Sequence, residues 1–324
     1  MDDAPQSGNQ KVSEGTQRPP RTKRPYFDFY SLNEPSRRPL TTPVLATRQI
    51  LAKELSRSEP EMDLARMFLL VAKEEYPQLC VDLYLARLDQ LAEEVKDRLA
   101  DETADLIVLG EVVDTLYRRR KFDGNRKAYY DPRNSFLNDV LDRGMGIPLT
   151  LGVVLLEVGW RLGLPLEGVS FPGHFLLRYR GDTANLLLDP FDSGKIRYED
   201  EAQDLLDRVY GGMVRLQDHF LRTATRRDML VRLLTNLKGV YVNVGDDPRA
   251  LAAVERILMV TPTSSIENRL RGVLLARLGR KDEAAEQLER YLRLAPSAAD
   301  SQRVAGFVED LRAGRDLPED QGID

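Results

Sequence analysis

The sequence predicts an α+β protein: a helical cap, an α+β core and a small all-α helical tail. Three observations lead to this class. Apolar residues recur at helical spacing between residues 45 and 118, an apolar helix followed by three strand-like runs occupies the middle, and the last third repeats every 34 residues. With 324 residues, 42% of them hydrophobic and 31% charged, the chain can bury a core without disulfides.

Composition excludes several classes of site. The single cysteine excludes a disulfide framework and a cysteine-based zinc site, and two histidines are too few for a histidine-rich metal site. The net charge of −5 gives no basic field for nucleic acid, and neither a membrane-spanning run nor a secretory signal is visible. We therefore expect a cytoplasmic protein with no metal, no cofactor, no nucleic-acid partner and no membrane contact.

The first 43 residues are polar and rich in proline and arginine, which predicts a disordered tail, and residues 316–324 form a second tail. The basic cluster Arg21, Lys23 and Arg24 could touch an acidic partner, although a solvated tail is the simpler interpretation. Residues 44–120 follow with apolar positions three and four apart, punctuated by prolines. This pattern predicts a subdomain of three or four helices.

The core predicted for residues 121–220 contains a helix that starts at Pro148. Proline suits a first helical turn because the N–H that it lacks would have no partner there, and Gly163 then ends the helix. We expect Trp160, on this helix, in the core. Strand-like runs follow at residues 167–171, 174–180 and 185–191. A helix followed by an antiparallel ladder predicts an α+β domain.

Residues 221–315 carry two helical repeats. Residues 231–264 align with 265–298 at an offset of 34, the period of tetratricopeptide repeats. The matched pairs are Gly245/Gly279, Ala250/Ala284, Val254/Leu288, Ile257/Tyr291, Leu258/Leu292 and Pro262/Pro296. The early positions depart from the pattern, since no tryptophan is present and Lys238 stands where the second unit has Gly272. Two repeats are fewer than the usual three, so we expect support from the preceding domain and from a capping helix near 299–313.

One pair of residues in the middle segment indicates chemistry. His174 falls on one strand and Asp189 on the next, and neighbouring antiparallel strands can bring such side chains within hydrogen-bonding reach. A carboxylate bonded to an imidazole orients the ring and stabilises its protonated form. This is two-thirds of a nucleophile–His–Asp arrangement, whose nucleophile would be expected at a helix N-terminus. Taken alone, however, a single histidine is more often structural, and Asp189 before Pro190 could equally be a turn residue.

The segment resembles the transglutaminase core, a relative of papain-like proteases, and more narrowly the bacterial SirB-type family, in which such a domain precedes tetratricopeptide repeats. The resemblance covers about residues 60–300. The stretches that carry it are Tyr130-Asp131-Pro132-Arg133-Asn134-Ser135, Arg143-Gly144-Met145-Gly146-Ile147-Pro148, Phe171-Pro172-Gly173-His174-Phe175 and Asp189-Pro190-Phe191.

The resemblance also implies that the nucleophile is missing. In active transglutaminase-like enzymes a Gly-x-Cys opens the central helix, about fifteen residues before a Gly-Ile/Leu-Pro turn. Here Gly163 begins that turn, and counting back puts Pro148 in the cysteine slot. His174 and Asp189 match the family histidine and aspartate, but proline has no nucleophilic atom. The resemblance therefore implies a protein without thiol-dependent acyl transfer, with His174 and Asp189 as remnants of a site.

Three other residues could supply a nucleophile, and each has a simpler interpretation. Cys80 lies on a predicted helix in a setting typical of a buried structural cysteine. Ser135 and its neighbour Asn134 precede an apolar helix, so one of them is expected to be its N-cap. Thr150 is close to the empty slot but can simply bond to backbone. His219 has no partner pattern and is expected at the surface or on a helix face.

Three functions compete. The first is a non-catalytic, regulatory protein that binds a protein or peptide through its repeats, with Asn134, Ser135, Arg143, Gly146 and His174 as binding candidates that the resemblance suggests. An excess of 17 basic over 12 acidic residues in 221–315 would favour acidic partners. The second is a hydrolase or acyl transferase with an unconventional nucleophile or an activated water. The third is a purely structural role.

Overall fold

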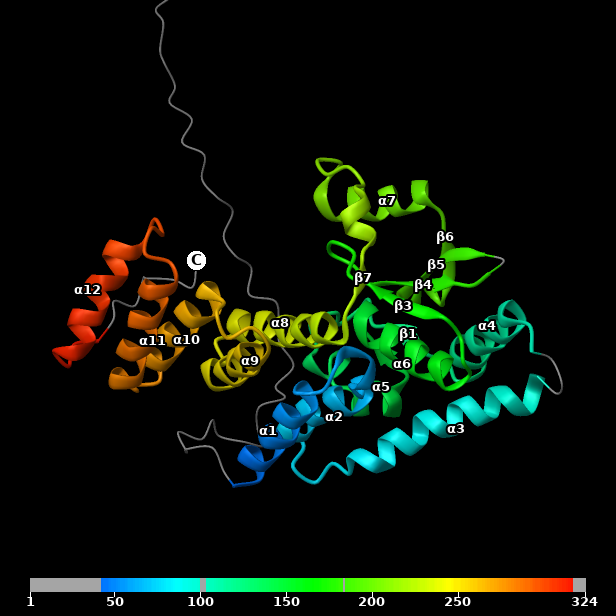
Figure 1. Cartoon of the computed structure of the whole chain (residues 1–324), viewed down its shortest axis with the longest axis horizontal. Helices are drawn as coiled ribbons and strands as arrows, with labels where there is room; N and C mark the ends of the chain where they lie inside the picture. Colours follow the sequence, from blue (N-terminus) through cyan, green and yellow to red (C-terminus); the bar gives the residue numbers. More distant parts are fainter. Residues whose placement is uncertain (1–41, 100–102, 183, 317–324) are drawn as a thin grey trace, which may run out of the picture. The chain divides into compact units, whose positions relative to one another are not determined.

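The computed structural model describes residues 42–99, 103–182 and 184–316, and Figure 1 shows how their helices and strands are arranged. The predictions for the N-terminal tail as far as residue 41, with Arg21, Lys23 and Arg24, fall outside the described residues. So does the tail predicted beyond residue 316.

The first third folds into four α-helices within the described residues, as its spacing predicts. Asp63 caps one of them by accepting a hydrogen bond from the backbone N–H of Arg66 at 2.8 Å, and residues 67–72 after this cap are buried without interruption. The elements are α1 (Thr42–Leu55), the 3-10 turn η1 (Glu59–Glu61), α2 (Leu64–Glu75), α3 (Val81–Leu99), α4 (Asp105–Val113) and the π-helical turn η2 (Asp114–Arg119).

Helix α6 (Pro148–Arg161) begins at the predicted proline and is buried along residues 148–159. Its one buried carboxylate, Glu157, accepts a hydrogen bond from the backbone N–H of Ala65 at 3.0 Å and thereby fixes the start of α2. Burial raises the pKa of this carboxyl, against the opposing hydrogen bond from Arg161. Trp160 lies at the edge of the core rather than inside it. It is half-buried, and its Nε1 donates to the carbonyl of Leu166 at 2.8 Å.

Five antiparallel strands form the sheet in the order β6-β5-β4-β3-β7. Leu177 and Leu188 pair across β4 and β5 and pack in one apolar cluster with α6, whereas the alternate residues Leu176 and Leu187 pack in another with the helix α7. Figure 1 shows α6 and α7 on opposite sides of the sheet. The elements are β3 (Leu166–Val169), β4 (Leu176–Arg180), β5 (Asn185–Asp189), the 3-10 turn η4 (Pro190–Asp192), β6 (Lys195–Arg197), α7 (Glu199–Tyr210), the 3-10 turn η5 (Asp218–Leu221) and β7 (Thr223–Ala224). The three predicted strands are the central ones.

A second, two-stranded sheet holds the start of α6. Its strands, β1 (Asp123–Gly124) and β2 (Met145–Gly146), are parallel, and the sequence analysis did not predict them. The 3-10 turn η3 (Pro132–Asn134) and helix α5 (Leu137–Arg143) lie between the two strands in the chain. Helix α5 ends at Gly144, whose φ of 65° suits glycine and turns the chain directly into β2.

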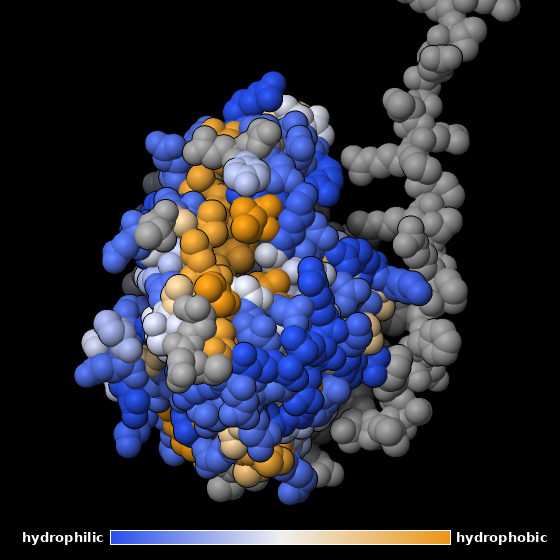
Figure 2. All heavy atoms as spheres, turned by 90° about the vertical axis from the view of Figure 1, so that its right-hand side faces the viewer, coloured by the Kyte–Doolittle hydropathy of each residue, from blue (hydrophilic) through white to orange (hydrophobic). Residues whose placement is uncertain are grey.

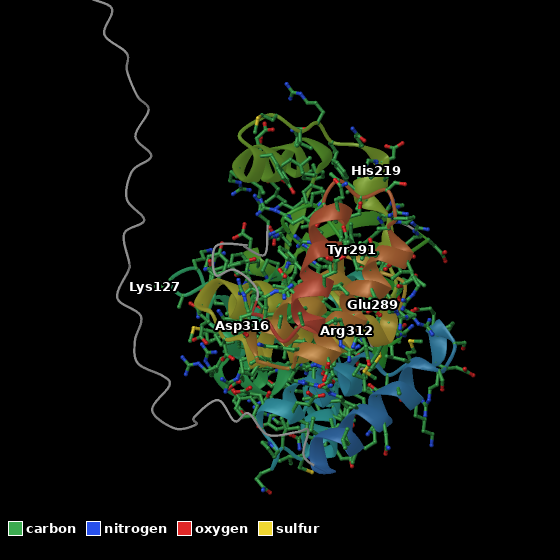
Figure 3. All side chains as sticks on the ribbon, turned by 90° about the vertical axis from the view of Figure 1, so that its left-hand side faces the viewer. Lys127, His219, Glu289, Tyr291, Arg312 and Asp316 are labelled. Carbon is green, nitrogen blue, oxygen red and sulfur yellow. The ribbon has the colours of Figure 1, made fainter. Side chains whose placement is uncertain are left out.

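The last third forms the two predicted helix pairs and the predicted capping helix. Gly245 and Gly279 both have a φ of 75° at the turns inside the two repeats. The helices are α8 (Arg226–Val244), α9 (Asp247–Val260), α10 (Ser265–Arg277), α11 (Lys281–Leu294) and α12 (Ser301–Arg312). Figure 3 shows Glu289 of α11 and Arg312 of α12 close together, and their ion pair of 3.1 Å joins the capping helix α12 to the second repeat.

Arginines connect the first repeat to the helical cap. Arg249 of α9 places two guanidinium nitrogens 2.8 and 2.9 Å from the carboxylate of Glu75, and Arg48 of α1 bridges Glu74 of α2 and Glu255 of α9. Buried apolar residues run continuously from α1 to α12. The expectation that the repeats lean on the preceding domain is thus confirmed, while the domain boundary at residue 221 stays a prediction.

Among the described residues, no helix is both long and apolar enough to cross a membrane. Some apolar side chains do remain exposed. On the side of the protein that carries α4 and β6, Figure 2 shows apolar atoms gathered in a strip within a hydrophilic surface. Leu106 and Ile107 of α4 and Ile196 of β6 are each between 40% and 51% exposed.

The close packing inside the second repeat yields a stability test. A Cβ on Gly272 would lie 2.6 Å from Leu288 and 3.3 Å from the carbonyl oxygen of Ala284, so Gly272→Val should lower the free energy of unfolding by about 1–3 kcal/mol. Gly306 in α12 has open space around it, so Gly306→Ala should raise that free energy by up to about 1 kcal/mol. Urea unfolding measures both changes. Equal effects of the two substitutions would contradict the packing described.

Candidate functional site

The structure brings His174 and Asp189 together at one end of the sheet. Asp189 ends β5 and His174 stands two residues before β4, and antiparallel pairing puts the start of one strand beside the end of the other. His174 Nε2 lies 2.8 Å from Asp189 Oδ1, with 12% of the histidine side chain and 2% of the aspartate side chain exposed. The predicted contact is therefore present, while its role stays a prediction.

Asp189 is held from the other side by an arginine that the sequence analysis missed. Arg197 of β6 donates to Asp189 Oδ2 at 3.0 Å and 3.3 Å, and the backbone N–H of Phe191 donates to Oδ1 at 3.0 Å. Burial alone would raise the pKa of this carboxyl, but the hydrogen bonds and charges of His174 and Arg197 outweigh it and lower the pKa. Asp189 is thus a fixed anion with both oxygens engaged.

Aromatic and basic side chains enclose His174. The ring of Phe191 meets the imidazole edge to face, with centroids 6.1 Å apart, and the guanidinium of Arg126 stacks on that phenyl ring at 4.7 Å. On the other side Arg232 of α8 donates to the carbonyl of His174 and, at 3.1 Å, to the hydroxyl of Ser170. Burial lowers the pKa of Arg232. These contacts fix the histidine backbone and leave its ring little freedom.

Tyr117 of the π-helical turn η2 is a further buried polar group near this pair. Its hydroxyl has no hydrogen-bond partner among the described residues. Burial raises the pKa of the phenol, and the negative charge of Asp189 raises it further. The phenol therefore stays neutral and keeps its proton.

One face of α6 packs against the residues that follow His174 and Asp189. Pro148 and Gly152 are one turn apart on α6 and so share a face. A Cβ on Gly152 would lie 2.7 Å from Phe175 and 3.4 Å from Pro190, the residues that follow His174 and Asp189. The helix face that carries Pro148 thus packs, at Gly152, against the residues next to the histidine–aspartate pair, while the assignment of Pro148 to the nucleophile position stays a prediction.

The nearby hydroxyls are arranged as structural groups. The Thr150 hydroxyl donates to the carbonyl of Asn134 at 2.7 Å and accepts from the backbone N–H of Ile147 at 3.2 Å, in agreement with the simpler interpretation of this residue. The N-cap predicted at Asn134 or Ser135 is wrong. Helix α5 starts after Phe136 without a side-chain cap, because Asn134 instead donates to the carbonyls of residues 128 and 129.

Two further expectations concern Cys80 and His219. Cys80 is exposed and lies in the connection just before α3, so the prediction of a buried helical cysteine is wrong. Helix α2 ends at Glu75, shortly before Pro77, and α3 starts only at Val81, so Cys80 lies between two helices. His219 is exposed in η5, as predicted, and Figure 3 shows it apart from the labelled residues of the repeats.

The structure brings together some, not all, of the binding candidates. Asn134 and Gly146 lie on either side of Thr150, since a Cβ on Gly146 would be 2.7 Å from the Thr150 hydroxyl. Ser135 lines a groove of about 540 Å³ between the core and α8. Arg143 lines a different hollow, and within the described residues His174 forms no hydrogen bond or ion pair with any of these four.

The groove beside Ser135 is lined by both parts of the protein. Tyr129 and Tyr130 contribute from the core, and Asn236, Gly239 and Asn243 contribute from α8. The side chains of Asn236 and Asn243 make no hydrogen bond within the described part of the chain. Nowhere in the described part of the chain do three or more histidine, cysteine, aspartate or glutamate side chains lie together so that they could hold a metal ion.

Sequence signals for the missed residues are weak. Arg197 sits on a three-residue edge strand, and Tyr117 and Arg232 lie on helices far from His174 in the chain. The sequence shows Phe191 in the Asp189-Pro190-Phe191 stretch, but it does not predict that this ring contacts the imidazole of His174. Only the folded topology joins these residues into one site.

Comparison with known proteins agrees with this architecture. The transglutaminase-like superfamily matches residues 82–235, and the tetratricopeptide repeat matches residues 237–308. A UPF0162 protein of Xylella fastidiosa is 37% identical over 246 residues, which is 75% of this chain and 88% of that protein. A UPF0162 protein of Pseudomonas aeruginosa is 30% identical over 82% of this chain and 96% of its own length.

A shorter similarity extends to eukaryotes. F-box only protein 21 of Mus musculus is 44% identical over 85 residues, which is 26% of this chain and 14% of that protein. No solved structure gives a significant match.

The lowered pKa of Asp189 predicts a pH-dependent contribution to stability. Because the folded pKa is below the ordinary 3.8, the charged carboxylate stabilises the fold above that pH, and this contribution disappears as the pH falls through the folded pKa. Near neutral pH, Asp189→Asn should cost about 3 kcal/mol, since it weakens a buried pair with Arg197.

Urea unfolding between pH 2 and 7 measures this difference. The gap between the wild type and Asp189→Asn should narrow below pH 4, while the exposed Asp82→Asn control should stay near the wild type throughout. A gap that is independent of pH would contradict the assigned charge.

Proposed function

The chain belongs to the UPF0162 family, and we propose that it acts by binding a protein or peptide partner, with its transglutaminase-like core as a non-catalytic scaffold. The tetratricopeptide repeats support interaction with proteins in general. We propose further that the likeness to the SirB-type family holds, that the protein acts in the cytoplasm, and that the histidine site is the remnant of an acyl-transfer centre.

The observation that carries the proposal is Pro148 at the first position of α6. A proline there supports a buried helix start but offers no atom for attack on a carbonyl carbon. Thr150, the nearest hydroxyl along the helix, donates to a backbone carbonyl, and Asp189 has both oxygens bonded. The hydrogen bonds around His174 and Asp189 thus suit a rigid structural role better than a catalytic one.

The groove between the core and α8 is the surface we assign to the partner. It combines two tyrosines with the free amides of Asn236 and Asn243, which can each donate to and accept from a peptide backbone. Asp131, the one carboxylate that lines the groove, is already paired with Arg133 at 2.7 Å, and residues 221–315 carry 17 basic and 12 acidic residues. This balance favours an extended peptide with acidic side chains.

Gly239 allows a test that leaves the fold intact. It lies in the middle of α8, lines the groove, and has open space where a Cβ would stand, so Gly239→Arg should fill the groove without a clash. Gly306 in α12 has the same open surroundings but lies outside the groove, which makes Gly306→Arg the matched control.

A partner should be captured by cross-linking, identified by mass spectrometry and purified. Its binding to each variant is then measured by titration calorimetry. We expect wild type, Gly306→Arg and His174→Ala to bind equally and Gly239→Arg to bind at least tenfold more weakly. Equal binding by the two arginine variants would contradict the groove assignment. A partner that is chemically changed by wild type but not by His174→Ala would contradict the scaffold role itself.

The hydrogen bond between His174 and Asp189 favours one alternative, a hydrolase or acyl transferase that uses an activated water or an unconventional nucleophile. An ester and amide substrate series with wild type and His174→Ala separates the two functions. Our proposal predicts the same background rate for both proteins. A rate that falls at least a hundredfold in His174→Ala would establish the alternative.

A further inference from the structure

A second hollow, of about 330 Å³, lies away from the groove and the histidine site. Its walls come from α3, from the chain after η2, and from the end of α5. Arg87, Arg120, Lys121 and Arg143 line it, together with a single carboxylate, that of Asp142. Two further carboxylates, those of Glu94 and Asp131, pair with Arg120 and Arg143 from outside the hollow, so four cations face three anions and a local excess of one positive charge remains in a protein whose net charge is −5.

Arg143 is unsatisfied in this hollow. Only 20% of its side chain is exposed, yet its guanidinium makes no hydrogen bond within the described part of the chain, and its Nη1 is fully buried. The carboxylate paired with it, that of Asp131, is 3.9 Å away, beyond hydrogen-bonding distance. Buried polar groups in native proteins nearly always have partners, and water or the oxygen atoms of a ligand can supply one for this guanidinium.

Lys121 is held in an unusual backbone conformation beside it. Its φ is 61°, and only one other non-glycine residue in the described ranges has a positive φ. Strain of this kind persists where the surroundings fix it and is concentrated at binding sites. The Lys121 side chain is exposed and forms no ion pair in the described structure, so its ammonium group is free.

Arg87 and Arg120 are the oriented members of the set. Arg87 pairs with Asp142 and donates to the carbonyl of Leu141 at 2.8 Å, and Arg120 donates to Glu94 at 2.7 Å. Their carboxylate partners fix both side chains at the rim. The two remaining cations, Lys121 and Arg143, supply the charge that no protein group neutralises by hydrogen bonding.

We propose that this hollow binds a phosphate group, either free or carried by a small phosphorylated molecule. A guanidinium fork and an ammonium group suit the several oxygens and multiple charge of phosphate. The volume is at the lower end of the range for small-molecule pockets, which matches such a ligand. The site shares no lining residue with the groove assigned to the partner, so it is independent of the proposed function.

The test is a titration of the full chain with inorganic phosphate and, in a second arm, with glycerol 3-phosphate. Calorimetry at constant ionic strength separates site binding from screening. Lys121→Gly removes the free charge, and glycine adopts the positive φ without strain, so this variant should fold at least as well as the wild type. Arg143→Gln is the second variant. Arg118→Gln is the control, because Arg118 is 84% exposed and does not line the hollow.

We expect saturable binding by the wild type and Arg118→Gln, and binding about tenfold weaker in Lys121→Gly and Arg143→Gln. Tighter binding of glycerol 3-phosphate would identify a phosphorylated small molecule as the ligand, and tighter binding of inorganic phosphate would identify the free ion. Absence of saturable binding in both arms would overturn the proposal. Equal weakening in Arg118→Gln and Lys121→Gly would also overturn it, since it would reflect net charge alone.

Discussion

The burial of α6 is the constraint on which the rest of the structure depends. Twelve consecutive residues of this helix are shielded from water, so other elements must cover it on all sides. The helical cap, the sheet and the first repeat each supply part of that cover. Glycines at 152 and 159 permit the close approach, because a Cβ at either position would overlap a neighbouring side chain.

If Pro148 replaces a nucleophile, as we propose, the same helix explains how the rest of the site keeps its arrangement. A proline at the first position keeps the helix start and its direction toward the sheet, where Asp189 is anchored by Arg197. The parallel strand pair β1–β2 fixes that start. Residues 120–122, just before β1, line the cationic hollow together with α3 and the end of α5. In our proposal the transglutaminase-like core keeps this arrangement as a scaffold, with its polar groups engaged in packing.

Much of this could be predicted from the sequence because it rests on local signals. Pro148 and Gly163 mark the ends of α6, and the 34-residue period locates the repeats with Gly245 and Gly279 in their turns. The contact between His174 and Asp189 follows from strand adjacency. Arg197, Arg232 and the exposed position of Cys80 could not be predicted, since they depend on a short edge strand, a distant helix and the end of a helical pattern at a proline. Phosphate-binding potential at Lys121 likewise depends on a backbone angle that the sequence does not specify.

We propose that Pro148 occupies the position of a lost nucleophile beside His174. Placing a thiol there tests this, as Pro148→Cys in a Cys80→Ser background, because the exposed Cys80 would otherwise react as well. The measurement is the pH dependence of alkylation with iodoacetamide. Our account predicts a thiol pKa clearly below the ordinary ~8.5 that returns toward it when His174→Ala is added. A thiol pKa near the ordinary value, unaffected by His174→Ala, would contradict it.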